Sequence, residues 1–308
     1  MPASRRLILA LLALLLALPA LPAFQATAPA PAPAALKGEP LLERVAVIGA
    51  SVSAGYGLPE IKKGAHLTLS QVIDASVPGK HQPCLDRSSL LAFADTLGSS
   101  KSALSALQKD DPTLVVALDY LFWFGYGSGW NGEKQRLAGL ELGLKSLEGL
   151  QCPVLLGDFP DMRSALNARV KILPPDAVPD PATLVKLNAR LAAWAKEHHN
   201  VILVPVSKLM GTLLAGEDLR VGPNLWTKNV VPELLQDDGL HTSIEGTTGL
   251  WLFAVERLFE ARKDLPRSAI ESKASVIDAK LLPDHKSSVV FEPLPEKRAK
   301  SAPAKADH

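Results

Sequence analysis

Three residues of types that cooperate in hydrolytic chemistry stand out in the chain: Ser51, Asp238 and His241. Ser51 lies in the small-residue segment GASVSAGYG, which follows the apolar run VAVI. Asp238 precedes His241 in DGLHTSIEGTTGLWL, just before a segment with helical periodicity. A serine nucleophile needs a base to take its proton, and a carboxylate must fix the tautomer of that base. The pattern predicts Ser51 as nucleophile, His241 as base and Asp238 as the orienting carboxylate.

Two of these residues have rivals close by in the sequence. Ser53 is a second serine in the same segment, and Asp237 is a second carboxylate near His241. A phosphate-binding turn is disfavoured because a Walker lysine and a full G-x-G-x-x-G are missing. A zinc site is disfavoured because it usually needs three or four ligands, and the sequence offers no second His/Cys cluster. We therefore expect neither a metal nor an organic cofactor.

The two segments resemble the first and last diagnostic blocks of the SGNH (GDSL-type) hydrolases, which usually read GDSLSxG and DGxH. The resemblance covers roughly residues 44–262 and is sharp only in these two blocks. It implies a serine ester hydrolase that uses Ser51, His241 and Asp238 as its triad and requires no cofactor. It also implies that the N–H groups of Ser51 and Gly98 bind the oxyanion.

The chain departs from the family pattern at two places. Ala50 stands where the first block usually has aspartate, and Leu121 falls near the asparagine of the family's third block, Gly-x-Asn-Asp. That asparagine donates to the oxyanion in the family, and losing one such donor typically slows a serine hydrolase about 10²–10³-fold. The candidate substitutes are Asn131 and the backbone N–H groups of Gly125, Gly127 and Gly129.

An aromatic cluster follows the apolar run 114–118. It consists of Tyr120, Phe122, Trp123, Phe124, Tyr126 and Trp130. Trp123, Tyr126 and Asn131 are predicted to contact the substrate as an apolar or sugar-stacking wall; the alternative is that half of the aromatic rings fill the core. The cluster also supports a second function hypothesis, in which a catalytically impaired protein binds a glycan or a lipid.

The segments that must position these residues alternate between strand and helix. Apolar runs typical of buried parallel strands occupy 45–49, 114–118, 153–157 and 201–206, and helical periodicity occupies 133–150, 181–199 and 242–262. This alternation predicts a three-layer αβα fold with a parallel sheet, of flavodoxin-like architecture. Residues 60–110 are ambiguous, because SLLAFA (89–94) fits either a strand or a helix.

The two ends of the chain differ from its middle. Residues 1–28 are typical of a signal peptide, with basic MPASRR before the short apolar run LILALLALLLAL; an uncleaved anchor is the alternative. Residues 29–39 are an Ala/Pro-rich linker, and 40–264 are the expected hydrolase-like domain. Residues 265–308 are expected to be a mostly disordered Lys/Pro-rich tail, with 289–291 as a candidate short strand. A periplasmic or secreted protein is predicted.

Composition restricts the partners. Lys+Arg number 33 against 32 Asp+Glu, so no basic face for nucleic acid is implied. Cys84 and Cys152 allow one disulfide in an exported protein, or two free thiols. The sequence thus predicts an exported esterase acting on a small-molecule, glycan or lipid ester. Carboxylesterase, lipase-like and acetyl-saccharide esterase activities stay open, and membrane contact is expected only through an uncleaved signal peptide.

Overall fold

The computed structural model describes residues 40–62 and 65–293. Its main sheet has five parallel strands in the order β4-β1-β5-β6-β7. The strands span Leu85–Asp86 (β4), Val45–Val47 (β1), Leu114–Ala117 (β5), Val154–Gly157 (β6) and Val201–Val204 (β7). β1, β5, β6 and β7 lie within the four apolar runs of the sequence. The predicted α/β fold with a parallel sheet is therefore confirmed.

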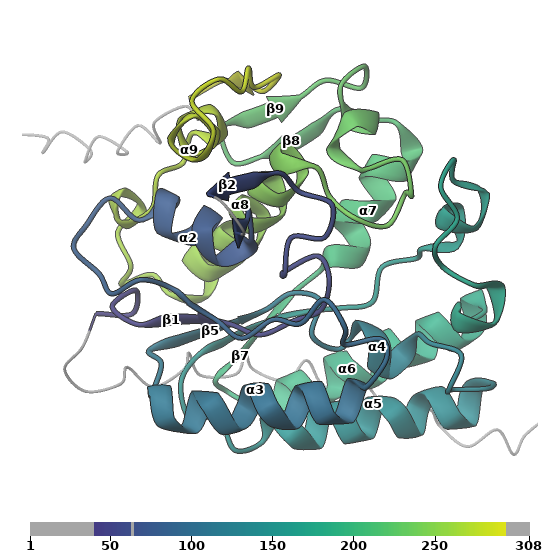
Figure 1. Cartoon of the computed structure of the whole chain (residues 1–308). Coiled ribbons are helices and arrows are strands. Elements are labelled where there is room, and N and C mark those ends of the chain that lie inside the picture. Colours follow the sequence, from purple (N-terminus) through teal and green to yellow (C-terminus); the bar gives the residue numbers. More distant parts are fainter. Residues whose placement is uncertain (1–39, 63–64, 294–308) are drawn as a thin grey trace, which may run out of the picture. The chain divides into compact units, whose positions relative to one another are not determined.

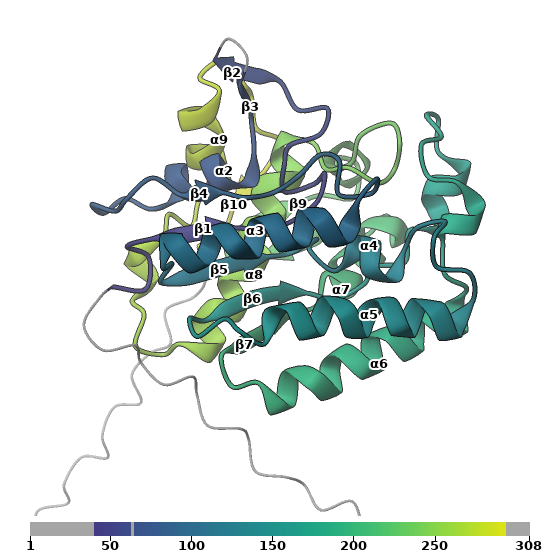
Figure 2. The same ribbon diagram turned by 60° about the horizontal axis from the view of Figure 1, so that its bottom comes forward.

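Helices cover both faces of this sheet (Figures 1 and 2). One face carries α3 (Thr96–Asp110), α5 (Glu133–Leu147) and α6 (Pro181–Glu197), and the other carries α2 (Leu69–Ser76) and α8 (Ile244–Ala261). Alternate residues of a strand point to opposite faces, so Val45 and Val47 join the core beneath α8 while Ala46 joins the core beneath α5 and α6. Burial on both faces explains why these strands are continuous apolar runs.

Smaller elements surround the sheet. Among the described residues they comprise the helices α4 and α7, the later helix α9 (Ala274–Leu281), a hairpin, a three-stranded antiparallel sheet and four 3₁₀ turns. Their bounds are α4 Phe122–Gly125, α7 Val206–Ala215, β2 Glu60–Lys62, β3 Ala65–His66, β8 Leu219–Val221, β9 Asn224–Trp226, β10 Val290–Phe291, and the 3₁₀ turns Arg163–Asn167, Pro175–Ala177, Val231–Leu234 and Arg267–Ala269. None of the helices in the described ranges is long and apolar enough to cross a membrane.

Two expectations for weakly patterned segments need correction. Residues 89–94 form neither strand nor helix but a turn that follows the short edge strand β4. The domain does not end at 264, because α9 (Ala274–Leu281) packs on α2 and α8. Ile270, Ala274 and Ile277 of this segment are buried in the core. Residues 265–293 are therefore part of the fold rather than a disordered tail.

Three further expectations concern the strand at 289–291, the two cysteines and the ends of the chain. The short strand expected at 289–291 is confirmed, since β10 pairs with β9. Cys84 and Cys152 are both free thiols, the first half-buried and the second buried, so the disulfide alternative is wrong. The predicted signal peptide (1–28), the linker (29–39) and residues 294–308 lie outside the described residues.

Candidate active site

The three residues selected from the sequence lie together at the carboxyl end of the parallel sheet, where open α/β folds build their sites. Ser51 follows β1, and its Oγ lies 2.7 Å from Nε2 of His241. The other ring nitrogen, Nδ1, lies 2.8 Å from Oδ2 of Asp238. His241 and Asp238 are only 3% and 5% exposed. An unbroken hydrogen-bonded chain thus runs from the serine hydroxyl to a buried carboxylate.

The loop between Asp238 and His241 is closed by the aspartate itself. Oδ1 of Asp238 accepts hydrogen bonds from the N–H groups of Leu240 (2.8 Å) and His241 (2.9 Å). Burial raises the pKa of the Asp238 carboxyl, but the hydrogen bonds from the His241 side chain and from these N–H groups bring the pKa below its ordinary value. The rival Asp237 instead pairs with Arg169 at 3.1 Å on the surface.

The rival serine has a different partner. Ser53 is fully buried, and its Oγ donates to Oδ1 of Asp119 at 2.6 Å, while Oδ2 of Asp119 accepts from the N–H groups of Val52 and Ser53. Burial raises the pKa of the Asp119 carboxyl, and the hydrogen bonds from Ser53 oppose this rise. A Cβ on Gly49 would lie 2.2 Å from Oδ1 of Asp119, so this contact requires glycine at position 49.

Gln236 and Tyr56 connect the turn that carries Ser51 (residues 49–57, the serine turn) to the loop that carries His241 (residues 236–242, the histidine loop). Nε2 of Gln236 donates to the carbonyl of Tyr56 (2.7 Å) and to that of Thr242 (2.8 Å). The Tyr56 ring lies against the imidazole of His241, with ring centroids 4.3 Å apart. Neither residue was selected from the sequence, because both contacts join segments that lie far apart in the chain.

Of the two N–H groups expected to bind the oxyanion, that of Ser51 is free at the site, within the described part of the chain, and that of Gly98 is not. The Ser51 N–H has no hydrogen-bond acceptor among the described residues and lies at the nucleophile. Gly98 is not such a donor, because it lies in the first turn of α3 and its N–H is bound to Oδ1 of the helix cap Asp95 at 2.8 Å. Leu121 is buried in the core. The N–H of Gly127 is bound to the carbonyl of Ala177, so it is no substitute donor.

None of the three residues predicted to contact the substrate, Trp123, Tyr126 and Asn131, lines the pocket at Ser51. Tyr126 is fully buried, stacks on Phe122 and donates from its hydroxyl to the carbonyl of Pro160. Asn131 is exposed at the start of α5, away from the residues that line the pocket at Ser51. Trp123 lines a separate small hollow beside Tyr120. Phe122 is the member of the cluster that lines the pocket at Ser51.

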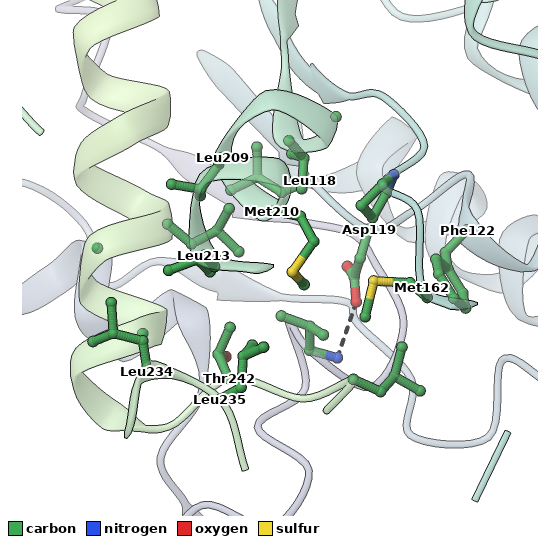
Figure 3. A pocket seen from close by; sticks show the side chains of 18 of the residues that line it. Leu118, Asp119, Phe122, Met162, Leu209, Met210, Leu213, Leu234, Leu235 and Thr242 are labelled. Carbon is green, nitrogen blue, oxygen red and sulfur yellow. Dashed lines mark hydrogen bonds between the residues drawn. The ribbon is translucent and has the colours of Figure 1, made fainter. Parts of the chain in front are cut away.

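A pocket opens beside Ser51 and has apolar walls (Figure 3). The space within it that the centre of a water-sized sphere can reach is about 80 Å³. In Figure 3 the side chains of Leu213 and Met210, both from α7, and of Met162 point into this space. Val206, Leu209, Met210 and Leu213 contribute the α7 side of the wall; Leu234, Leu235 and Leu240 come from the segment before His241.

Two carboxylates of the pocket wall follow strands directly. Asp119 comes just after β5 and Asp158 just after β6. Both oxygens of Asp158 are bound by Ser207, one by its N–H and one by its hydroxyl, each at 2.6 Å. Burial raises the pKa of the Asp158 carboxyl, and these hydrogen bonds oppose the rise. A polar residue at the carboxyl end of a buried strand was the sequence signal that could have indicated both residues.

In the described part of the chain, no group of three His, Cys, Asp or Glu side chains is arranged to hold a metal ion.

Fold and site together define a three-layer α/β protein with a hydrogen-bonded serine, histidine and aspartate at the carboxyl edge of its sheet. No family model and no curated protein sequence matches the chain.

Solved structures of other proteins do match its fold. The lipase/acylhydrolase from Enterococcus faecalis is 17% identical, with 75% of this chain and 98% of that chain covered and a TM-score of 0.44. A GDSL-like lipase from Bacteroides thetaiotaomicron is 16% identical, with 72% and 89% covered and a TM-score of 0.39. This likeness concerns the fold, and the function proposed below depends on the geometry of the site.

Proposed function

We propose that the protein is a serine hydrolase that cleaves carboxylic esters, with Ser51 as nucleophile. The observation that carries the proposal is the continuous pair of short contacts from Ser51 Oγ to His241 and from His241 to Asp238. A serine hydroxyl is a weak nucleophile unless a base takes its proton, and an imidazole acts as that base only in the right tautomer. Asp238 accepts a hydrogen bond from the Nδ1–H of His241, which keeps the proton on Nδ1 and leaves Nε2 unprotonated towards Ser51.

The reaction proceeds in two halves. Ser51 Oγ attacks the ester carbonyl carbon while its proton passes to Nε2 of His241, and the carbonyl oxygen becomes an oxyanion beside the Ser51 N–H. The bond to the alcohol oxygen then breaks, and His241 returns the proton to the leaving alcohol. In the second half, water gives a proton to His241 and attacks the acyl-serine. The carboxylic acid departs, and Ser51 regains its proton.

The oxyanion site of this proposed enzyme is sparse. The Ser51 N–H is the donor that the geometry supports, since Gly98 and Gly127 have other acceptors. One missing donor typically costs about 10²–10³-fold in rate. We therefore expect slower turnover than in a hydrolase with a complete oxyanion hole, although the nucleophile itself is activated.

A fluorophosphonate probe tests this proposal, because it reacts with activated serines and reports the position of the adduct by mass spectrometry. We expect an adduct on Ser51 of the wild-type protein and none in Ser51→Ala or His241→Ala. Ser53→Ala is the matched control, because Ser53 lies in the same turn but bonds Asp119 instead of His241. Absence of any adduct on wild-type protein with a native circular dichroism spectrum would refute the proposal.

We also propose that the protein is exported to the periplasm or the exterior. The support is the sequence of the first 28 residues, in which a basic start precedes a short apolar run and small residues. Intact-mass measurement of the protein recovered from these compartments tests the proposal. A mature chain beginning after about residues 23–28 is expected; a full-length chain retained in the membrane fraction would contradict it.

A further inference from the structure

The pocket beside Ser51 is walled mainly by apolar side chains. Beyond the serine, most of the wall is aliphatic or thioether carbon from α7, α8 and the strand ends. Three further polar side chains reach it: Asp119, Asp158 and Thr242. A ligand that enters this space must therefore be stabilised by apolar contact or by whatever hydrogen-bonding capacity these three retain.

Each of these three side chains already makes hydrogen bonds within the protein, so little of that capacity is left for a ligand. Both oxygens of Asp119 accept hydrogen bonds from the serine turn, and both oxygens of Asp158 accept them from Ser207. The Thr242 hydroxyl is bonded to the Thr247 hydroxyl at 2.7 Å. A sugar ring placed here would lose the water bonded to its hydroxyls and gain too few partners to replace it, which is costly for each hydroxyl left unpaired. A hydrocarbon chain pays no such cost.

The position of the pocket decides which part of an ester would occupy it. Ser51 lies on its wall, so a carbonyl carbon at Ser51 Oγ places one substituent at the pocket entrance. The leaving alcohol must receive its proton from His241, whose ring contacts the exposed Tyr56. The acyl chain is then the substituent that extends between α7 and α8 into the apolar space.

Resting on the serine-hydrolase function proposed above, we infer that the substrate is an ester of a medium- or long-chain fatty acid, whose acyl chain fills this pocket. Acetylated saccharides do not use it. Each methylene that enters an apolar site contributes about 0.8 kcal/mol, or a factor of about four in transition-state binding. The specificity constant kcat/KM should therefore rise steeply with acyl length until the pocket is full.

Hydrolysis of 4-nitrophenyl acetate, butyrate, octanoate and dodecanoate tests the inference in the purified full chain. We expect kcat/KM for octanoate to exceed that for acetate by at least about 100-fold, because several methylenes are buried. Leu213→Trp places a larger side chain into the pocket from α7 and should lower the octanoate-to-acetate ratio at least about tenfold. Val206→Phe, on the same wall, provides a second filling variant if the first fails to fold.

Leu214→Trp is the matched control. Leu214 is the next residue of α7, is 44% exposed and does not line the pocket, so the same substitution there should leave the chain-length profile unchanged. A wild-type profile that is flat or highest for acetate, with the phosphonate adduct still on Ser51, would overturn the fatty-acyl inference and leave the hydrolase function standing. A folded protein with neither adduct nor ester hydrolysis would overturn both.

Discussion

Ser53, two residues after the nucleophile, donates a hydrogen bond from its hydroxyl to the carboxylate of the half-buried Asp119 at 2.6 Å. The same carboxylate holds the N–H groups of Val52 and Ser53, so the end of β5 fixes the backbone that follows Ser51. The pair turns a small-residue loop into a rigid support for the nucleophile. Asp119 thus acts on the site through the backbone of the serine turn, without touching the substrate's reacting atoms.

Removal of the Asp119 carboxylate should therefore loosen the turn. Asp119→Ala leaves buried N–H groups without an acceptor, at about 1–3 kcal/mol each, so the free energy of unfolding should fall by about 3 kcal/mol. Asp119→Asn should recover most of this loss, because its amide oxygen can accept from the two N–H groups and its amide can donate to Ser53 Oγ. Urea denaturation and the phosphonate labelling rate of Ser51 measure the two effects. Equal losses in both variants would show that the negative charge, and not the hydrogen bonding, matters.

Asp238→Asn should leave the fold intact and slow the reaction of Ser51. The amide cannot hold the Nδ1 proton of His241 as the carboxylate does, and such changes in serine proteases cost on the order of 10⁴-fold. The rate of phosphonate labelling at neutral pH is the measurement. Asp237→Asn is the control, because Asp237 pairs on the surface with Arg169 and should change the rate less than about twofold. Similar losses in the two variants would contradict the assigned role of Asp238.

Asp278 is expected to make the stability of the protein fall as pH rises from about 4 to 6. Burial raises its pKa to about 6, although hydrogen bonds from Thr248 and Ser287 oppose the rise. Between the ordinary aspartate pKa of about 3.9 and this value, the folded state binds more protons than the unfolded state, so stability falls as pH rises. Relative to wild type, Asp278→Asn should gain on the order of 2–3 kcal/mol of stability from pH 4 to pH 7. Urea denaturation across this range measures the difference, and a flat difference would contradict the pKa assignment.

The segment after residue 264 should contribute to global stability. Ile277 is fully buried where α9 packs on α2 and α8. Ile277→Ala should lower the free energy of unfolding by about 2–5 kcal/mol, the usual cost of such a core truncation. Val290→Ala serves as control, because Val290 in β10 is 46% exposed and its truncation should cost less than about 0.5 kcal/mol. Equal unfolding midpoints for the two variants in urea would show that α9 does not belong to the cooperative core.

Much of the fold was predictable because its strands are buried on both faces. The four longer strands of the main sheet are continuous apolar runs, and α5, α6 and α8 carry helical periodicity over many residues. β4 was not recognised, because it has two residues and a polar second position. α9 was missed because its buried residues, Ala274 and Ile277, stand among lysines and serines in a short helix.

In the candidate site, too, the residues with a local sequence pattern were predictable and those held by long-range contacts were not. The placement of Asp238 and His241 was predictable because they are only three positions apart in the sequence, and that of Ser51 because it follows a strand. Gly98 was misplaced because Asp95, three residues earlier, caps α3 and takes its N–H. The partners of Asp119 and Asp158 lie 49 or more residues away in sequence, so no local pattern could pair them. The apolar pocket depends on how α7 packs beside α8, which periodicity does not give.

The contact between Ser51 and His241 joins positions 190 residues apart. Between these positions the chain must form β5, β6 and β7. Each of these strands pairs in parallel and is reached through a crossover connection, which brings distant segments together at an entropic cost. A chain that has formed only its N-terminal strands holds the serine but lacks its base. Reactivity at Ser51 therefore arises only with the finished topology, and titration of this serine will count natively folded molecules in a refolding or expression sample.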